Sequence, residues 1–570
     1  MHRITVTSLV FFWLLSSSSP LFPAPVSLAG QAGPVVGATT VLHHGTVLTM
    51  DSQSRVAEAV ALQGDRIVAV GNNQEVLALA GPGTLRVDLR GKTVVPGLID
   101  THMHIVSGAQ SLELVQLGGA RSLADLQDVI RRAAAARPRG SWIITAGTWA
   151  PSQLKEKRFP TRRELDQAAP DHLVYVARGG HTAILNSLAL ARAGITRETR
   201  DPAGGRIERD PSGEPAGVIL DKALPLARRV LPPVTLADQV RALREAQRAF
   251  HAVGLTGIRD AGVSARDVQV FKELWARGEL TLRLRLLVRV EGTPALPGLL
   301  PLSGFGDRWL KFEGVKIGVD SAFEFALMSE PLREGHALQV MSLEELRAVI
   351  ATANRQGWRV STHALGDRAV ELVVQLYEEA NRTIPITGRR WTIEHGTVPR
   401  SERDIVAGTD SRQIFARIKA LGLVLTVQHH PLIRVGSMLK SWGPVRAGYA
   451  LPARDWLKAG IPIAGGSDFP VVPYSPFVVM KWLVTRETQD AGIIRGDQGL
   501  TREEGLRSYT SWAAYLSQEE EWRGSLEPGK AADLAVLSDN PLTVPGERLA
   551  EIVSLFTLVD GRIVHRAAGW

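Results

Sequence analysis

The 570-residue sequence contains no cysteine. Disulfides, thiol nucleophiles, iron–sulfur clusters and cysteine-based zinc sites are therefore excluded, and any metal ion must be held by His, Asp, Glu or Lys side chains. Beyond the N-terminal segment, no apolar run approaches the roughly 18 residues that a membrane-spanning helix requires. Phosphate-binding P-loops, Gly-x-Ser-x-Gly nucleophile motifs and dinucleotide-binding glycine fingerprints are absent as well.

The composition is that of a globular protein, with 45% apolar and 22% charged residues. The formal net charge is +8, but the basic residues are scattered and acidic residues interrupt every run. No basic stripe interleaved with aromatic residues occurs, so we interpret the charge as solvated surface and predict no nucleic-acid partner. The length suggests about three to four domains of roughly 150 residues, unless one large barrel takes up most of the chain.

The first 29 residues have the pattern of a signal peptide. Arg3 precedes an apolar run over residues 4–15, and Ser27-Leu28-Ala29 is a small-residue cleavage pattern. A buried N-terminal helix is the alternative, but residues 16–25 are too rich in Ser and Pro for one. We therefore predict export to a bacterial periplasm or secreted space, with no stable membrane anchor after cleavage.

Short β-type runs separated by glycine-containing turns fill residues 38–96 and return over residues 511–570. Neither stretch is long enough to bury a sizeable core alone, so we predict one composite β-sandwich built from both chain ends. Residues 97–510 alternate strand and helix patterns, which predicts an α/β fold with a parallel sheet, and their number suits a (β/α)8 TIM-like barrel. Within them, residues 107–250 exceed what a barrel needs and are predicted to contain an inserted lobe.

His102 and His104 follow the apolar run over residues 94–99. Residues two apart on a strand point to the same face, so both imidazoles can reach one metal ion, although two polar residues on an exposed strand would look alike. More ligand-capable residues recur where later strands end: Lys316, His363, His395 and Asp468. Because the carboxyl ends of barrel strands meet in one cavity, this set predicts a hydrolytic metal site.

These residues, taken in order, resemble the metal-binding residues of the amidohydrolase superfamily. The closing sequence Gly-Ser-Leu-Glu-Pro-Gly-Lys-Ala-Ala-Asp-Leu at residues 524–534 is similar to that family's return to its sandwich. The sequences around Gly180-His181-Thr182 and Gly204-Gly205-Arg206 resemble the narrower amidohydrolase 3 (YtcJ-like) branch. The resemblance covers nearly the whole chain, and its motifs are specific for fold and metal chemistry but not for substrate.

The resemblance implies a divalent metal centre, with two zinc ions as the expected cofactor. Its ligands would be His102, His104, Lys316, His363, His395 and Asp468. The first two and Asp468 would hold the more buried ion, and His363 and His395 the more exposed one. Lys316 would bridge both ions as a carbamate formed with carbon dioxide, since a free ammonium repels a dication; an ordinary lysine is the alternative.

The resemblance also implies a metal-dependent hydrolase of carbon–nitrogen bonds other than peptide bonds, such as those of amides, formamides or cyclic amides. A metal-bound hydroxide would attack the carbonyl carbon, and Asp468 would carry the proton to the leaving nitrogen as the catalytic proton shuttle. Three alternatives stay open: a one-metal deaminase of the same superfamily, a catalytically silent ligand-binding protein, and ester or lactone hydrolysis by the same metals.

We expect a small-molecule substrate. Assembly into a homodimer is an open alternative to a monomer. The residues predicted to contact the substrate are His181, Trp149, His430 and Asp320. A structural histidine is the alternative for His181, and a buried tryptophan in the core of the lobe is the alternative for Trp149. The loop after Lys316 departs from the family pattern of an Asp-Gly pair among small residues, because Asp320 is followed by Phe323 and Glu324. Because of this departure, the substrate preference of the relatives does not predict that of this chain.

Overall fold

A computed structural model describes residues 37–179, 182–202, 205–290 and 304–570. The predicted signal peptide and His181 lie outside the described residues and stay predictions. Every element below belongs to one unit, Ala38–Trp570. Within the ranges just given, no helix has both the length and the apolar character needed to cross a membrane.

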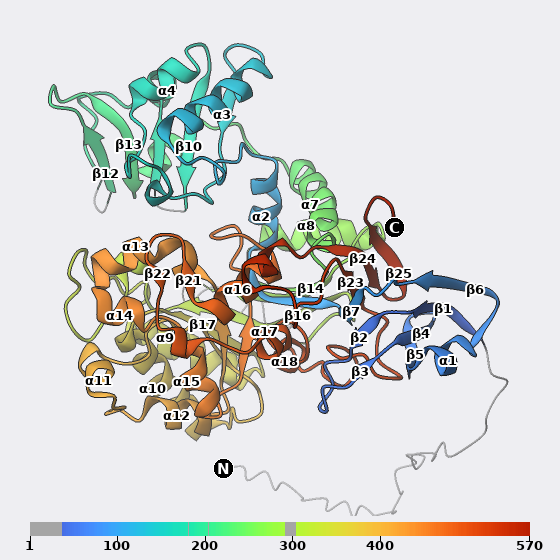
Figure 1. Cartoon of the computed structure of the whole chain (residues 1–570). Helices are drawn as coiled ribbons and strands as arrows, with labels where there is room; N and C mark the ends of the chain where they lie inside the picture. Colours follow the sequence, from blue (N-terminus) through green and yellow to red (C-terminus); the bar gives the residue numbers. More distant parts are fainter. Residues whose placement is uncertain (1–36, 180–181, 203–204, 291–303) are drawn as a thin grey trace, which may run out of the picture. The chain divides into compact units, whose positions relative to one another are not determined.

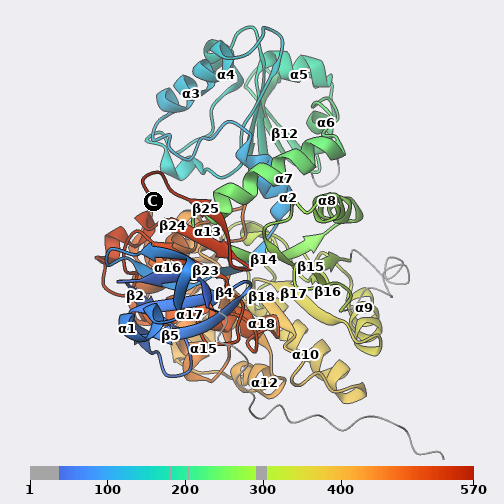
Figure 2. The same cartoon turned by 90° about the vertical axis from the view of Figure 1, so that its right-hand side faces the viewer.

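Strands from the two ends of the chain pair with one another. One sheet has the order β5-β4-β1-β6, and the other combines both ends in the order β25-β24-β23-β7-β2-β3. Strands β7 and β23 run antiparallel, with Leu534 opposite Pro96. Leu42 from the first sheet packs in one apolar cluster with Val94 and Leu534 from the second. The predicted composite sandwich is present, and its blue and red strands lie side by side in Figures 1 and 2.

The elements of this part of the chain are β1 (Ala38–His43), β2 (Thr46–Leu48), β3 (Val56–Ala57), β4 (Ala59–Gln63), β5 (Arg66–Gly71), α1 (Asn73–Leu77), β6 (Ala80–Asp88), β7 (Thr93–Pro96), β23 (Leu534–Leu537), η6 (Gly546–Glu551), β24 (Ser554–Val559) and β25 (Arg562–Arg566).

Eight parallel strands form the central sheet, in the order β20-β19-β18-β17-β16-β15-β14-β8. The two edge strands meet where Thr101 Oγ1 donates a 2.8 Å hydrogen bond to the carbonyl of Gly465. The sheet is therefore nearly closed, and the predicted barrel is confirmed. Its strands are β8 (Leu98–Met103), β14 (Leu255–Val263), β15 (Arg283–Arg289), β16 (Leu310–Gly318), β17 (Arg359–Ala364), β18 (Thr392–His395), β19 (Val424–Val427) and β20 (Ile463–Gly465).

Capping residues determine where helices of the barrel begin. Ser342 and Glu345 form the reciprocal hydrogen bonds of a capping box at the start of α9 (Leu343–Arg355). This helix buries the apolar face that contains Leu346 and Val349, and it leads into β17, near whose end His363 lies. Figure 2 shows α8, α9 and α10 on the outer side of the strands. The packing of each helix against the sheet thus determines where the next strand ends. The functional side chains at the strand ends are positioned in this way.

The remaining elements here are α7 (Leu236–His251), α8 (Ala265–Ala276), η4 (Phe323–Phe325), α10 (Asp367–Thr383), α11 (Glu402–Ala407), α12 (Ile414–Ala420), α13 (His430–Trp442), α14 (Pro444–Gly448), α15 (Ala453–Lys458), α16 (Pro476–Thr485), β21 (Glu487–Thr488), β22 (Gly492–Ile493), η5 (Gly496–Gln498), α17 (Arg502–Ser508) and α18 (Ser511–Leu516). Helix α18, which follows the predicted barrel limit at residue 510, packs Ala513 and Ala514 against Ile99 of β8.

A separate lobe is inserted between β8 and β14, which pair directly in the barrel. Its five-stranded sheet has the order β12-β13-β11-β10-β9 and forms the upper part of Figure 1. The elements are α2 (Ile105–Leu112), α3 (Leu123–Ala135), β9 (Trp142–Ile144), η1 (Pro151–Gln153), α4 (Arg162–Ala168), β10 (Leu173–Arg178), β11 (Thr182–Leu185), α5 (Ser187–Ala193), β12 (Gly205–Arg209), β13 (Pro215–Asp221) and α6 (Leu224–Arg228).

Trp149, predicted to contact the substrate, lies instead in the core of this lobe. Its side chain is fully buried among apolar residues, and its indole Nε1 donates a 2.7 Å hydrogen bond to the carbonyl of Ala177. Phe159 packs edge-on against the ring. An indole with its single donor satisfied by backbone stabilises the lobe, so the structure corrects the predicted substrate role to a packing role.

Candidate metal centre

The predicted ligands meet at the carboxyl ends of the barrel strands. His102 lies near the end of β8, Lys316 on β16 and His395 at the end of β18. Asp468 follows β20, and His430 opens α13 directly after β19. Together with His104 and His363, these side chains line one cavity of about 710 Å³.

Asp468 stands between two groups of ligand-capable side chains. Its Oδ1 lies 3.5 Å from His102 Nε2 and 3.3 Å from His104 Nε2. Its Oδ2 lies 2.9 Å from His430 Nε2, and His395 completes this second group. An ion held tetrahedrally at about 2.0–2.2 Å separates its ligand atoms by roughly 3.3–3.6 Å, so the spacing of the first group suits a small divalent cation.

Two atoms at the centre of the first group have no hydrogen-bond partner. His102 Nε2 and Asp468 Oδ1 are both buried and unsatisfied among the described atoms. A buried polar atom without a partner destabilises a fold by about 1–3 kcal/mol, and native proteins rarely leave one unexplained. A cation between a neutral imidazole nitrogen and a carboxylate would satisfy both, so the residues present fit a divalent metal.

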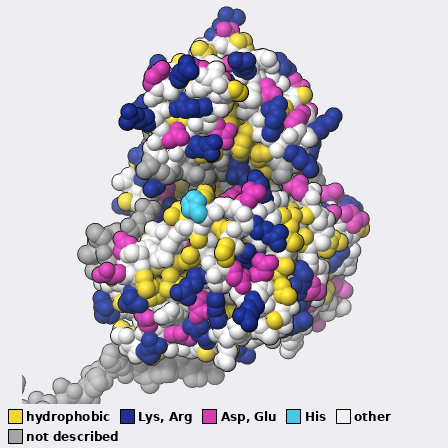
Figure 3. All heavy atoms as spheres, turned by 90° about the vertical axis from the view of Figure 1, so that its left-hand side faces the viewer, with side chains coloured by type: hydrophobic (Ala, Val, Ile, Leu, Met, Phe, Trp, Pro, Cys, Tyr) yellow, Lys and Arg dark blue, Asp and Glu magenta, His cyan; other side chains and the backbone are white. Residues whose placement is uncertain are grey.

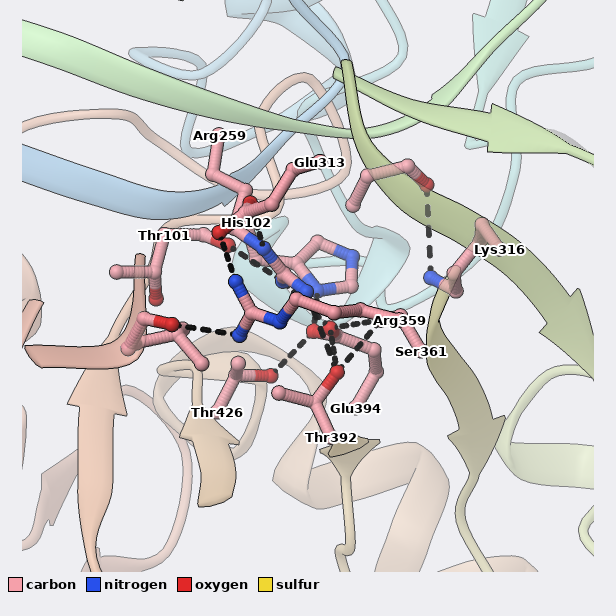
Figure 4. Close-up of polar contacts among 12 residues, drawn as sticks. Thr101, His102, Arg259, Glu313, Lys316, Arg359, Ser361, Thr392, Glu394 and Thr426 are labelled. Atoms are coloured by element: carbon pink, nitrogen blue, oxygen red, sulfur yellow. Dashed lines mark hydrogen bonds and ion pairs between the residues drawn. The ribbon is translucent and has the colours of Figure 1, made fainter. Parts of the chain in front are cut away.

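Below the cavity, Glu394 determines which nitrogen of His102 faces the other ligands. Its Oε2 accepts a hydrogen bond from His102 Nδ1, which leaves Nε2 as the lone-pair nitrogen. The same carboxylate accepts from Arg259 Nη1 at 2.7 Å and from Thr426 Oγ1 at 2.5 Å (Figure 4). Although burial alone would raise the pKa of Glu394, the charge of Arg259 holds it well below its usual value.

His395 is oriented in the same way by an amide. Gln428 Oε1 accepts a 2.8 Å hydrogen bond from His395 Nδ1, which leaves Nε2 as the free nitrogen. Burial lowers the pKa of His102 to about 4 and that of His363 to about 3, with the charge of Lys316 acting in the same direction. The imidazoles of His102 and His363 are therefore neutral at ordinary pH, as metal ligands must be.

Lys316 and His363 line the cavity but stand outside the two tight groups. Lys316 Nζ donates a long 3.5 Å hydrogen bond to the carbonyl of Ala261, and burial lowers the pKa of its amine. His363 Nε2 lies 3.3 Å from the carbonyl of Ser321. The ring of His363 does lie beside that of His395, with centroids 4.6 Å apart, but the tight group that includes His395 is completed by His430 and Asp468.

Asp320, predicted to bind the substrate, has its carboxylate engaged by the backbone. Its two oxygens accept hydrogen bonds from the N–H groups of Leu327 (2.9 Å), Leu365 (3.0 Å) and Gly366 (3.0 Å). Burial raises the pKa of this carboxyl to about 7. The side chain fastens the loop after β16 to the end of β17, which corrects its predicted role to that of a loop anchor at the edge of the cavity.

The sequence analysis missed several side chains that the fold brings to this site. The buried supporting network consists of Arg259, Glu313, Arg359, Glu394 and Gln428. Three arginines also line the cavity: Arg178 at the end of β10, Arg289 at the end of β15 and Arg434 on α13. A signal existed for Arg434, because it lies four residues after His430 and so shares its helix face.

The chain is similar to known proteins over most of its length. Residues 86–565 match the family described as the amidohydrolase family. An N-substituted formamide deformylase of Arthrobacter pascens is 31% identical over 546 residues, covering 92% of this chain and 98% of that protein. The YtcJ protein of Bacillus subtilis is 28% identical over 541 residues, or 92% of this chain and 99% of that one. The crystal structure of an uncharacterised metal-dependent hydrolase from Pyrococcus horikoshii superimposes with a TM-score of 0.69 at 25% identity, covering 89% and 99% of the two chains.

Proposed function

Because the chain belongs to the amidohydrolase family and is a hydrolase of carbon–nitrogen bonds, we propose that it cleaves amides, formamides or cyclic amides with metal-activated water and Asp468 as proton shuttle. The observation that carries the proposal is the position of Asp468. Its carboxylate is shared between two histidine groups, and its Oδ1 and the facing His102 Nε2 are buried without partners. The formamide deformylase among the relatives supports the choice of an acyl–nitrogen bond.

The proposed ligands of one ion are His102, His104 and Asp468. Those of the other are His363 and His395, with Lys316 as a bridging carbamate and His430 beside Asp468. The expected ions are zinc, which when bound would supply a Lewis acid that polarises the carbonyl and lowers the pKa of water. The carbamate forms when the neutral amine of Lys316 attacks carbon dioxide; a nitrogen–carbon bond forms, and one proton leaves.

Within this scheme, the side chains of the chain have distinct tasks. Asp468 receives a proton from the attacking water and returns it to the leaving nitrogen, since only a protonated amine departs easily. His430 holds the second oxygen of that carboxylate at 2.9 Å and so restricts its rotation. Glu394 and Gln428 keep His102 and His395 in one orientation, which is the usual role of groups behind metal-binding histidines.

Replacement of Asp468 by Asn tests the proposal directly. We expect kcat to fall by about 10²–10⁴, the range for losing a general acid–base group, while most of the metal is retained. Asp260→Asn is the matched control, because that buried carboxylate accepts a hydrogen bond from the backbone N–H of Ile105, which an amide oxygen can also accept. Unchanged turnover in Asp468→Asn would exclude the shuttle role.

Metal content separates the alternatives. Two ions per chain in protein prepared with bicarbonate support the bridged site, and one ion favours the one-metal deaminase. Protein that takes up none after metal is added back, and hydrolyses nothing, is the ligand-binding protein.

We also propose that the chain is exported to the periplasm or the medium through residues 1–29. The motif of Arg3, the apolar run and Ser27-Leu28-Ala29 supports this. N-terminal sequencing of protein recovered from cell fractions tests it, since a mature chain that starts after Ala29 is expected outside the cytoplasm. Light scattering of the same sample tests the homodimer.

A further inference from the structure

Two arginines stand at the junction of two cavities. Arg178 ends β10 of the lobe, and Arg434 lies one turn into α13 after His430. Both line the metal-centre cavity, and both line a second cavity of about 630 Å³ between the lobe and the barrel. The two elements approach closely here, since a Cβ at Gly179 would lie 3.8 Å from Arg434 Nη2. Figure 3 shows one face of the waist between lobe and barrel, with both basic and acidic side chains above and below it.

Both guanidinium groups have donors that the described residues leave unused. Arg434 is only 6% exposed; its Nη2 donates a 3.3 Å hydrogen bond to the carbonyl of Val471, but its buried Nη1 has no partner. The buried Nε of Arg178 has none either. A guanidinium remains charged in proteins and carries five N–H donors, so burying it with donors unmatched is unfavourable unless a ligand supplies the acceptor.

The charges beside this pair do not cancel. Among the described residues, the one acidic side chain that forms an ion pair with either arginine is Glu324. Its Oε1 lies 4.0 Å from Arg178 Nη2. Ser437 of α13 donates a hydrogen bond to the same oxygen, so this carboxylate is already partly occupied. Glu324 is therefore shared by the two guanidinium groups, and the other acidic group near Arg434, Asp468, is already held by the histidines of the metal centre.

The second cavity extends this positive field outward. Its charged lining residues are Lys157, Arg158, Arg178, Glu208, Arg434 and Lys440. Arg158 forms an ion pair with Glu164, and Lys440 forms one with Glu334; neither glutamate lines the cavity. Basic side chains therefore still outnumber acidic ones on the cavity wall. A concave surface of one sign concentrates ligands of the opposite sign and speeds their entry.

We propose that Arg178 and Arg434 bind a carboxylate of the substrate, so that the preferred substrates are N-acyl or N-formyl compounds whose nitrogen substituent carries a carboxylate. This rests on the proposed function for the position of the scissile bond. Planar guanidinium groups bind carboxylates through paired N–H donors, and the unused Nη1 and Nε supply such donors. Hydrolysis adds the hydroxyl of water to the acyl carbon and its proton to nitrogen, which releases a carboxylic acid and an amino acid.

Kinetics with two matched probes tests the subsite. N-formylphenylalanine and N-formylphenethylamine differ only by the carboxylate. We expect the metal-loaded wild type to favour the first by about 10–100-fold in kcat/KM, the equivalent of one charge-assisted hydrogen-bonded contact. Arg434→Gln should remove most of this preference through KM, with a much smaller effect on the neutral probe. Equal rates for both probes in the wild type, or an equal loss for both in Arg434→Gln, overturn the proposal.

Arg178→Gln is the second variant, because Arg434 is buried and its replacement could unfold the chain. Lys458→Gln, which removes one exposed positive charge from α15, is the control for net charge. It should leave both probes unaffected.

Equilibrium binding separates this proposal from the proposed function. Calorimetry with 3-phenylpropionate, phenethyl alcohol and inorganic phosphate needs no turnover. Tighter binding of the carboxylate than of the alcohol, lost in Arg178→Gln and Arg434→Gln, supports the subsite even if no formamide is cleaved. Binding that the variants do not change, or a preference for phosphate, overturns it.

Discussion

His102 and Glu394 share a hydrogen bond at the base of the metal centre, from imidazole Nδ1 to carboxylate Oε2. Both side chains are fully buried. The bond fixes the tautomer of His102 and directs its unsatisfied Nε2 at Asp468. Since a group behind a metal-binding histidine contributes to metal affinity as well as to the fold, the two contributions can be measured separately.

We predict that Glu394→Gln lowers metal affinity by about 10–100-fold, because a neutral amide makes His102 a weaker ligand. Glu313→Gln is the matched control, since Glu313 also pairs with Arg259, at 2.9 Å. Both variants should lose stability, as each weakens a buried ion pair, but only Glu394→Gln should lose affinity for metal. Competition with a chelator measures the affinity; equal losses in the two variants would make Glu394 merely structural.

A second prediction distinguishes His363 from His430. We expect His363→Ala to lose one ion per chain, because His363 is the proposed ligand of the second metal. His430→Ala should keep both ions and lower kcat about tenfold or more, because Asp468 loses the partner that orients it. Elemental analysis beside steady-state kinetics checks this. Loss of metal in His430→Ala alone would exchange the two roles and match the tight group formed by His395, His430 and Asp468.

Much of the fold could be predicted because its signals are local. The capping box of Ser342 and Glu345, the apolar face behind it and the polar residue near the strand end each lie within a few residues. His102 and Asp468 could be assigned because ligand-capable residues at strand ends converge in any parallel barrel. Because the local sequence pattern and the barrel topology agree here, the positions of these residues in the fold could be predicted from the sequence.

The supporting residues could not be predicted, because their partners are distant in sequence. In the sequence, Glu394 is one polar residue in a short strand. It contacts His102 only because the barrel closes. Arg178 and Arg434 belong to different parts of the chain and meet only once the lobe stands beside α13. The two positions of Trp149 could not be separated for a related reason, since an indole in a lobe core and one in a substrate cavity have the same local sequence.

The joint between barrel and sandwich gives a prediction on stability. Arg283 of β15 donates to both oxygens of Asp533, at 2.6 and 2.8 Å, and both side chains are buried. We expect Asp533→Asn to lower the free energy of unfolding at pH 7 by about 3–5 kcal/mol, because it leaves a buried guanidinium without its main counter-charge. Thermal unfolding measures this, with the exposed Asp65→Asn as control.

The same pair makes stability depend on pH. Burial would raise the pKa of Asp533, but the charge of Arg283 outweighs it and lowers the pKa. A carboxyl whose pKa is lower in the folded than in the unfolded chain, where it is about 3.9, stabilises the fold above that value. The stabilisation is lost as the pH falls toward the folded pKa. The difference between wild type and Asp533→Asn should therefore shrink below about pH 4, whereas a constant difference would assign the effect to packing.

The last prediction concerns Lys316, whose buried amine is 3.5 Å from a backbone carbonyl and lines the cavity of the proposed ligands. Lys316→Met keeps an unbranched chain of similar volume but cannot react with carbon dioxide. We expect it to lose one ion per chain and most turnover, since only the carbamate gives the second ion an anionic ligand from this position. Wild type supplied with isotope-labelled bicarbonate should show one carbamate signal per chain by NMR, absent from the variant. A wild type that binds two ions without this signal would show that Lys316 contributes as an ordinary lysine.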